Sequence, residues 1–319
     1  MSTATQSDEA PIYVKEFRLH KFILCARSKY FARKLLPSEG RKSPQTLPLP
    51  NSVDSKAFEI AVRFLYLGEI AQLFSGDLLV HMLRISAFLD LPSLWDFVFT
   101  SDSQKQRRQK QDNEIDKAME DLDAWFDEFV LAKAVRVNFH EADAFRMEVA
   151  NDSFADVVLR SDEVAGNRPP RATPDWEPQA VFYPVHKAML RSEFFTIMFT
   201  SSFKEGQKLS PDEPLHIVSL EIQPHILELV LRFLYSEKVV VPLEHALDTL
   251  YASDQLFIER LKVKATMIIS SQGLCGLPGD YGDNNENREN FSAEGYGVYD
   301  VIRAGWATRQ HKLEEFGAK

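Results

Sequence analysis

Two histidines stand in matching local contexts, as His20-Lys21 and His186-Lys187. Histidine is the side chain that most often transfers protons near neutral pH, so both are first considered as general acids or bases. Such catalysis also requires a nucleophile and a group that orients the histidine, and the sequence reveals no such set. A histidine that packs at a strand–helix junction and bonds to the backbone is the favoured interpretation. We therefore predict that the chain is not an enzyme.

The two cysteines, Cys25 and Cys275, are the other reactive side chains. They lie far apart and form no CxxC pair, and no cluster of Cys and His has the spacing of a structural zinc site. A disulfide between them remains one alternative, but two cysteines in a chain this long fit a reducing compartment better. Gly273, Gly276 and Gly279 follow no β-rich run and precede no Gly-Lys-Ser/Thr, so they do not predict a phosphate loop. Neither a metal nor a cofactor is predicted.

The charge balance limits the classes of partner. The chain has 37 basic and 47 acidic residues, a net charge of −10, which does not attract nucleic acids or anionic membranes through bulk charge. It has no run of about 18 apolar residues and opens on a polar segment, so it predicts neither a membrane span nor a secretory signal peptide. The basic run 105–110 (KQRRQK) fits either a nuclear import signal or a solvated helix start. The expected location is the cytoplasm or the nucleus.

An internal repeat organises the 319 residues, a length that suggests two domains. The tetrapeptide Arg63–Tyr66 (RFLY) recurs as Arg232–Tyr235, and one block upstream and one downstream recur in the same order. The matched positions in those blocks are His20, Lys21, Leu24, Arg27, Ser28 and Phe31 with His186, Lys187, Leu190, Arg191, Ser192 and Phe195, and then Ile85, Leu89, Leu91 and Leu94 with Ala252, Leu256, Ile258 and Leu261. Three collinear blocks predict two copies of one domain of about 100 residues.

The second copy predicts the elements that must position these residues. Short β-rich runs indicate strands, the first two paired across a polar loop, and apolar residues at helical spacing indicate helices. The predicted strands cover 154–159, 180–185 and 215–218, and the predicted helices lie within 186–199, 224–234 and 247–261, the last running into 262–269. Each copy is therefore expected to be a small sheet with helices around it, an α+β unit.

A region of different composition separates the copies. Residues 112–128 carry eight acidic residues against one lysine, a net charge of −7. Met119, Leu122, Trp125 and Phe126 recur there at helical spacing. We predict an amphipathic acidic helix that docks on one of the two copies.

The repeated motifs resemble those of the BTB/POZ domain. That family has an Asp-Val strand, an aromatic-x-x-His-Lys motif, a Leu-x-x-Arg/Cys-Ser-x-x-Phe helix and a helix that ends in Phe-Leu-Tyr. The second copy matches with Asp156-Val157-Val158, His186-Lys187, Leu190, Ser192, Phe195, Phe203-Lys204-Glu205 and Phe233-Leu234-Tyr235. The first copy matches with His20-Lys21, Leu24-Cys25-Ala26-Arg27-Ser28, Phe31 and Phe64-Leu65-Tyr66. The tandem arrangement is similar to fungal ankyrin-repeat-and-BTB/POZ proteins, although no ankyrin repeat is visible in this sequence.

The resemblance implies an α+β fold with two BTB/POZ-like units, a helical linker and a C-terminal helical stub. The Gly/Asp/Asn-rich segment after the second unit is expected to be disordered or a mobile loop. The chain then stops within helices that resemble the start of a BACK domain, as a truncated domain would. The expected boundaries are 11–100 for the first unit, incomplete at its N-terminus, 101–151 for the basic-then-acidic linker, 152–272 for the second unit, 273–294 for the loop and 295–319 for the BACK-like helices.

Two departures from the family pattern limit what can be carried over. The first copy offers one predicted strand, 12–20, with no Asp-Val strand before it, so we expect its sheet to be incomplete. The segment His186–Ser192 is two residues shorter than His20–Ser28. Two residues are about 200° of helix, so side chains beyond the deletion need not occupy the family positions.

The resemblance implies an interaction module whose family function is to bridge a substrate to cullin-3 in a ubiquitin ligase. In that family, an apolar-x-Glu motif after the third helix places its apolar side chain in a cullin pocket, and Phe203-Lys204-Glu205 stands at that place. The alternative is a solvated loop in which Phe203 packs locally. The family also forms a charged pocket, which implies that Asp156 lies beside Lys187; the alternative is a surface lysine unrelated to Asp156.

A second functional class stays open at this point. A BTB scaffold without ligase activity, or a transcription-associated dimerisation protein, would show the same motifs, and binding to cullin-3 separates the two classes. BTB domains resemble dimerising modules, and two tethered copies meet at high effective concentration. We therefore predict intrachain pairing of the two units, with cullin-3 and a substrate as the protein partners.

Overall fold

The computed structural model describes residues 15–37, 44, 46–70, 74, 76–99, 104–149, 151–163, 177–201, 206–207, 209, 213–272 and 296–313. The chain divides into two compact units, Met1–Ala118 (unit 1) and Met119–Lys319 (unit 2), and the division falls within one helix. The expected α+β fold is confirmed, and its four-stranded sheet lies in unit 2, whereas the small sheet expected in the first copy does not occur among the described residues of unit 1. The predicted loop at 273–294 lies outside the described residues, and so does Cys275.

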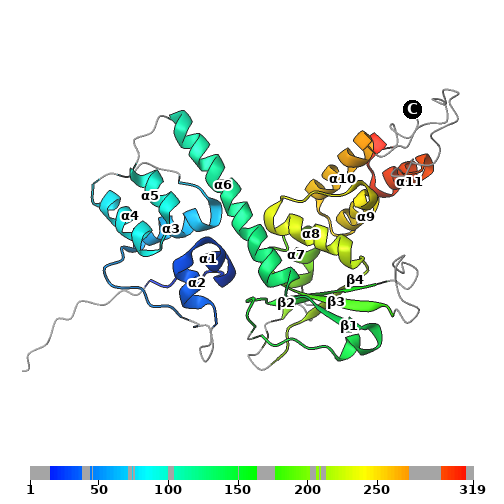
Figure 1. Ribbon diagram of the computed structural model, residues 1–319, viewed down its shortest axis with the longest axis horizontal. Helices are drawn as coiled ribbons and strands as arrows, with labels where there is room; N and C mark the ends of the chain where they lie inside the picture. The colour runs from blue at the N-terminus through cyan, green and yellow to red at the C-terminus, as the bar shows by residue number, and fades with distance from the viewer. Residues whose placement is uncertain are drawn as a thin grey trace, which may run out of the picture. The chain divides into compact units, whose positions relative to one another are not determined.

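Within the described residues of unit 1, all the regular secondary structure is helical (Figure 1). Its core is built from Phe22, Phe31, Phe64 and Met82, each at most 2% exposed. The elements are α1 (Lys21–Arg27), α2 (Lys29–Leu35), α3 (Ser55–Leu67), α4 (Asp77–Phe88), α5 (Pro92–Phe99) and the first part of α6 (Gln104–Phe126). The prediction of a strand over 12–20 is wrong for 15–20, which form no strand. A strand requires a partner, and the described part of unit 1 offers none.

Helix α3, which carries the first RFLY motif, has a defined signal at each end. At its start, the Asp54 carboxylate accepts a hydrogen bond from the Ala57 N–H at 2.8 Å, a standard N-cap. At its end, Gly68 adopts φ +67°, a conformation that glycine reaches without strain. A Cβ at Gly68 would also lie 3.2 Å from the backbone of Ile115 in α6. Glycine therefore ends α3 and lets α6 approach it closely.

Unit 2 is built on a four-stranded sheet with the order β1-β3-β2-β4. Strands β2 and β3 pair antiparallel, as predicted, with Val157 opposite Val185, and β4 runs parallel to β2. The strands are β1 (Val135–Asn138), β2 (Val157–Asp162), β3 (Gln179–Val185) and β4 (Ile217–Leu220). Strand β1 was not predicted: it lies inside the segment expected to be a helical linker and pairs antiparallel with β3.

Both faces of this sheet are covered. On one face, Tyr183 of β3 reaches the helix over residues 224–236 and donates a hydrogen bond to Glu228 at 2.8 Å. On the other face, Val158 and Phe182 form a cluster with the segment 139–149, where the Phe145 ring lies 4.1 Å from the Phe182 ring between centroids. Strand β3 and the first half of β2 therefore read as almost continuously apolar, because both of their faces are buried.

Helices make up most of the rest of unit 2, and α7 and α8 lie over the sheet in Figure 1. The helices are the second part of α6, the π-turn η1 (Asp127–Leu131), the 3-10 turns η2 (Phe139–Ala144) and η5 (Leu243–His245), α7 (Glu193–Thr200), α8 (Pro224–Ser236), α9 (Ala246–Gln255), α10 (Glu259–Gln272) and α11 (Val298–Thr308). Within the described ranges, no helix combines the length and the apolar character that crossing a membrane requires.

The prediction of one helix running from 247 to 269 is wrong, because the chain breaks between α9 and α10. Phe257 adopts φ +53°, and the Ile258 N–H bonds back to the Ser253 carbonyl at 2.8 Å. The same turn closes α4 in unit 1, where Asp90 adopts φ +56° and the Leu91 N–H bonds to the Ser86 carbonyl at 2.9 Å. The repeat therefore preserves a helix-ending turn as well as side chains.

Candidate partner-binding site

The repeated histidine of unit 2 is held by three hydrogen bonds. The His186 N–H donates to the Tyr235 hydroxyl at 3.1 Å, and the ring Nδ1 lies 2.7 Å from the same oxygen. The ring Nε2 lies 2.7 Å from the Ser153 carbonyl, which can only accept. A neutral imidazole protonated at Nε2, which accepts from Tyr235 at Nδ1, satisfies all three groups. His186 is 2% exposed and bonded to backbone, as predicted.

Unit 1 repeats this His–Tyr clasp in a more open setting. The His20 N–H donates to the Tyr66 hydroxyl at 2.7 Å, and Nδ1 lies 3.0 Å from it. His20 is exposed, whereas its counterpart in unit 2 is buried. Burial raises the pKa of the Tyr66 phenol, and it raises that of Tyr235 further. In both units the histidine of the His-Lys motif is hydrogen-bonded to the tyrosine of the RFLY motif.

The helix that follows each clasp begins at the same serine. Ser28 caps α2 by accepting from the Phe31 N–H at 3.4 Å, and Ser192 caps α7 by accepting from the Phe195 N–H at the same distance. The two residues missing from unit 2 are taken up upstream, where unit 1 forms α1 and unit 2 forms only turns. The deletion therefore leaves the capping serine and the buried phenylalanine in place.

The structure brings Asp156 and Lys187 together through a hydrogen bond between the Asp156 side chain and the Lys187 backbone. The Asp156 Oδ1 accepts from the Lys187 N–H at 2.7 Å, while the Lys187 Nζ lies 4.9 Å from the centre of the Phe199 ring in α7. The carboxylate thus holds the turn after the histidine, and the ammonium covers the face of an aromatic ring. The role of this pair as a charged pocket stays a prediction.

The predicted cullin motif, Phe203-Lys204-Glu205, lies outside the described residues. Its surroundings are described on both sides: α7 ends at Thr200, and Gly206 follows the motif. A Cβ at Gly206 would lie 2.7 Å from the Ser201 carbonyl oxygen and 2.8 Å from that of Phe199. Only glycine fits against the end of α7 at this position. The binding role of the motif stays a prediction.

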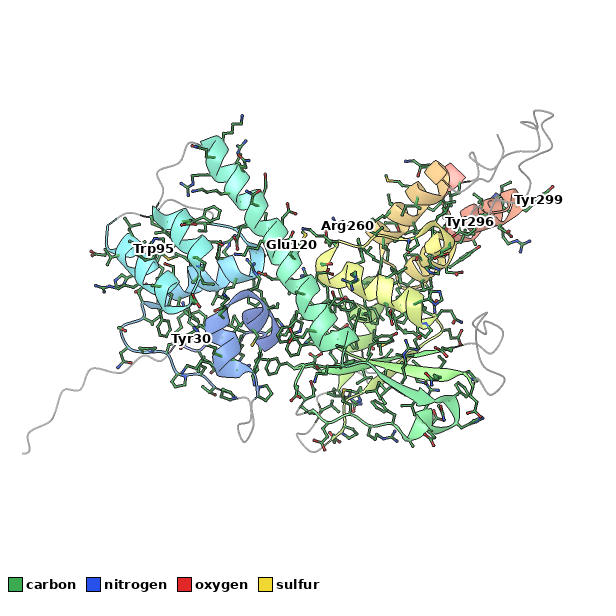
Figure 2. All side chains as sticks on the ribbon, viewed as in Figure 1. Tyr30, Trp95, Glu120, Arg260, Tyr296 and Tyr299 are labelled. Carbon is green, nitrogen blue, oxygen red and sulfur yellow. The ribbon has the colours of Figure 1, made fainter. Side chains whose placement is uncertain are left out.

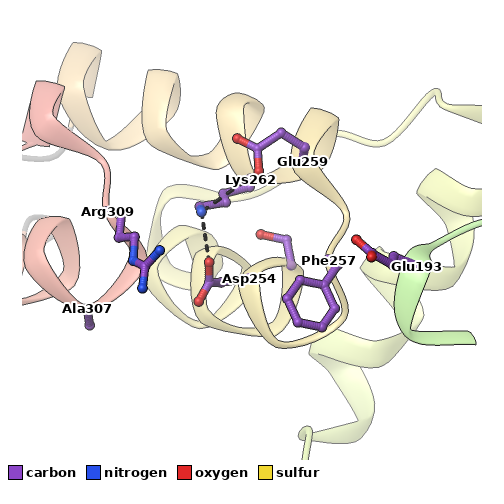
Figure 3. Close-up of a pocket in the computed structure, with 8 residues that line it drawn as sticks. Glu193, Asp254, Phe257, Glu259, Lys262, Ala307 and Arg309 are labelled. Atoms are coloured by element: carbon purple, nitrogen blue, oxygen red, sulfur yellow. Dashed lines mark ion pairs between the residues drawn. The ribbon is translucent and has the colours of Figure 1, made fainter. Parts of the chain in front are cut away.

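A groove near the start of α7 was missed by sequence reasoning (Figure 3). It has a volume of about 480 Å³, and Phe257, 60% exposed, projects from the α9–α10 turn beside it. Its lining residues are Glu193, Ser253, Asp254, Phe257, Glu259, Lys262, Ala307 and Arg309. They come from α7, from α9, α10 and the turn between them, and from the end of α11, so no local motif reveals them.

Two polar side chains that line this groove make local contacts within unit 2. The Lys262 ammonium lies 2.8 Å from the Asp254 carboxylate and is therefore paired. The Ser253 hydroxyl donates to the Leu250 carbonyl at 2.8 Å, so it faces the backbone of α9. Within the described part of the chain, no three His, Cys, Asp or Glu side chains are placed to hold a metal ion.

The acidic helix docks on unit 2 as predicted, through the RFLY helix. Arg232 of α8 binds Asp123 at 2.8 Å and also pairs with Asp127, and the Ser236 hydroxyl donates to Asp123 at 3.0 Å. The Arg232 guanidinium lies 5.2 Å from the centre of the Phe126 ring. Lys238 adds an ion pair to Glu120, which projects from α6 (Figure 2).

In unit 1, the first part of α6 is fixed by a buried ion pair. The Arg27 guanidinium binds Glu114 at 2.8 Å, and their side chains are only 2% and 7% exposed. The Arg27 Nε also donates to the Leu65 carbonyl at 3.3 Å. The matching residue of unit 2, Arg191, is exposed, so this buried pair belongs to unit 1 alone.

Comparison with known proteins gives matches over both copies. A BTB/POZ domain model matches residues 9–106 and 175–273. An ankyrin repeat-containing protein of Saccharomyces cerevisiae is 27% identical over 324 residues, covering 96% of this chain and 56% of the relative. BTB/POZ domain-containing protein 3 of Schizosaccharomyces pombe is 25% identical over 307 residues, covering 94% of this chain and 48% of the relative. The chain spans about half the length of these curated relatives.

Proposed function

Because the chain belongs to the BTB/POZ domain family and carries two copies of the domain, we propose that it is a substrate adaptor of a cullin-3 type ubiquitin ligase. BTB/POZ domains are interaction domains, so the chain is a protein–protein interaction module. The adaptor role is the more specific form of that function. It requires one surface that binds the cullin and another that binds the substrate.

The observation that carries the proposal is the place of the apolar-x-acid motif in unit 2. In the sequence, Phe203-Lys204-Glu205 stands between the end of α7 at Thr200 and Gly206, which lies against the end of that helix. Large aromatic residues are among those that most often anchor an interface, so Phe203 is the residue of this motif proposed to bind the cullin.

Unit 1 has a different part in this proposal. Residues 36–48 stand at the equivalent place and contain no apolar-x-Glu motif, so one chain offers one cullin motif. The proposal includes pairing of the two units within one chain. Only unit 2 then contacts the cullin, because unit 1 has no such motif. The alternative, a BTB scaffold or transcription-associated dimerisation protein without a ligase, is supported by the same two domains and excludes cullin binding.

Calorimetric titration with the N-terminal domain of cullin-3 tests the proposal. The Phe203→Ala variant should weaken binding by about 2 kcal/mol or more and leave the melting temperature unchanged. The matched control is Phe139→Ala, which truncates an aromatic side chain that is 44% exposed on η2 and should bind normally. Absence of binding by the unmodified chain would favour the scaffold. A large fall in melting temperature without a selective loss of binding would show that Phe203 belongs to the core.

A further inference from the structure

One surface of the molecule already binds an acidic helix. On α8, Arg232, Tyr235 and Ser236 receive the second part of α6, and we call these three residues the acid-helix site. Two carboxylates share the Arg232 guanidinium. The ring that lies under the guanidinium also lies 5.1 Å from the Tyr235 ring between centroids. The site thus recognises a helix that carries two acids one turn apart with an aromatic residue between them.

The repeat places an equivalent surface on α3 of unit 1. Arg63, Tyr66 and Leu67 match Arg232, Tyr235 and Ser236 in order and spacing. The two helices also have the same orientation around the motif, because each terminal tyrosine makes the same two hydrogen bonds to its histidine. We call Arg63, Tyr66 and Leu67 the equivalent face.

The equivalent face is open. Arg63 is exposed, and the Leu67 side chain beside it is 50% exposed. In the acid-helix site, by contrast, the Arg232 side chain is only 26% exposed. The same arginine of the repeat is thus covered by a helix in unit 2 and accessible in unit 1.

Helix α6 does not fill the equivalent face, because it contacts a different side of α3. Its Ile115 backbone lies against Gly68, and its Glu114 pairs with Arg27. The contact at Gly68 is made at the C-cap of α3, whereas the stripe formed by Arg63 and Leu67 is exposed on the helix itself. The stripe therefore stays available beside a helix that is already docked.

We propose that the equivalent face of unit 1 binds an acidic amphipathic helix of a partner protein. Arg63 would receive two carboxylates one turn apart, as Arg232 does, and Leu67, which stands where Ser236 donates to Asp123, would offer an apolar contact to the ligand helix instead of that hydrogen bond. A charge difference beside the equivalent face narrows the range of helices that it can bind. Glu69 stands where unit 2 has Lys238, the partner of Glu120. The ligand therefore carries a neutral or basic residue at the position of Glu120.

This inference is independent of the proposed ligase role. The cullin motif belongs to unit 2, whereas the equivalent face belongs entirely to unit 1. A failure of cullin binding leaves the helix-binding test unaffected, and the reverse also holds.

A peptide taken from the chain itself provides the probe. We would synthesise residues 112–131 with Glu120→Lys, label the peptide, and measure its fluorescence anisotropy with the full chain. Saturable binding is expected, and Arg63→Glu should weaken it by about tenfold or more, because a charge reversal turns two attractions into repulsions. Arg84→Glu, an exposed arginine of α4 in the same unit, is the matched control and should bind normally.

Two further peptides check the chemistry of recognition. The peptide with the natural Glu120 should bind more weakly than the Glu120→Lys peptide, since Glu69 repels it. A peptide with Asp123→Asn and Asp127→Asn should lose binding. The proposal is overturned if no peptide binds, if Arg63→Glu binds as the unmodified chain does, or if Arg84→Glu causes the same loss. Circular dichroism melts of both variants establish that they fold.

Discussion

The two units share their motifs but not their surroundings. Both hold a histidine against the tyrosine of RFLY, both begin the next helix at a capping serine, and both end a helix with the same left-handed turn. Unit 2 adds a sheet covered on both faces, and its clasp is buried. In the described part of unit 1 there is no strand, and His20 is exposed.

The two units therefore share the hydrogen bonds of their helical frame, while the segment that separates the copies differs in what it adds to each. In unit 2, the segment after α6 supplies both β1 and the cover of one sheet face. Unit 1 instead gains a buried ion pair from the first part of α6. The segment between the copies is thus structural in each unit, although in unit 2 it extends the sheet and in unit 1 it neutralises a buried charge.

The largest expected effect concerns that ion pair. Glu114→Ala leaves the buried Arg27 guanidinium without its counter-charge, which should destabilise unit 1 by about 3–5 kcal/mol. Urea unfolding of the full chain should show a separate early transition for unit 1. The control is Asp112→Ala, an exposed acid on the same helix, which should change the free energy of unfolding little. Equal effects of the two substitutions would show that the pair contributes nothing.

The next effect compares the two clasps. Tyr235→Phe removes the hydroxyl that binds a buried backbone N–H and a ring nitrogen, so it should cost about 1–3 kcal/mol. Tyr66→Phe should cost about 1 kcal/mol or less, because water can replace the hydroxyl at the exposed His20. Thermal unfolding of both variants checks this order. A larger loss for Tyr66→Phe would contradict the difference in burial.

A smaller effect separates the two arginines of RFLY. Arg232→Ala removes partly exposed ion pairs to α6 and should cost about 1 kcal/mol, since such pairs are weakened by solvent. Arg63→Ala should leave the free energy of unfolding nearly unchanged, because that side chain is exposed. The Arg232 effect should shrink when unfolding is repeated at about 1 M salt, where the screening length is only about 3 Å. An effect independent of salt would point to packing on Phe126 instead.

The smallest effect at neutral pH is expected from Cys25. Burial raises the pKa of its thiol from 9.0 to about 12, although the nearby Lys21 partly opposes this. A raised pKa stabilises the folded state fully below pH 9, and this contribution is lost as the pH rises towards 12. Cys25→Ala should therefore remove part of the fall in melting temperature of unit 1 between pH 9 and 12. If the melting temperatures of the Cys25→Ala variant and of the unmodified chain depend on pH in the same way, the effect cannot be assigned to Cys25.

Much of this arrangement could be predicted because the two copies share short sequence motifs. The tyrosine that ends RFLY and the serine before each phenylalanine recur at spacings that predict equal roles, and the structure gives them equal hydrogen bonds. The acidic helix was also predictable, since an apolar stripe among many acids can be buried only against another surface. The arginine that binds the acidic helix, Arg232, belongs to the second RFLY motif.

Other features carry no such signal. Strand β1 has four residues and a mostly exposed pattern, so neither its length nor its alternation distinguishes it from a loop. The break at Phe257 has no glycine or proline in the second copy, although Pro92 marks the equivalent turn in the first. The groove beside Phe257 is assembled from three distant segments, which only tertiary packing brings together.

Sedimentation velocity of the chain mixed with the N-terminal domain of cullin-3 tests the central claim most directly. If the two units pair within one chain and only unit 2 carries the cullin motif, the chain alone sediments as a monomer of 36.5 kDa. With cullin-3 in excess it should form a complex of one chain and one cullin, and Phe203→Ala should reduce the fraction of the chain found in that complex. A stable dimer of chains that binds two cullins, or a chain that binds none, would contradict the account.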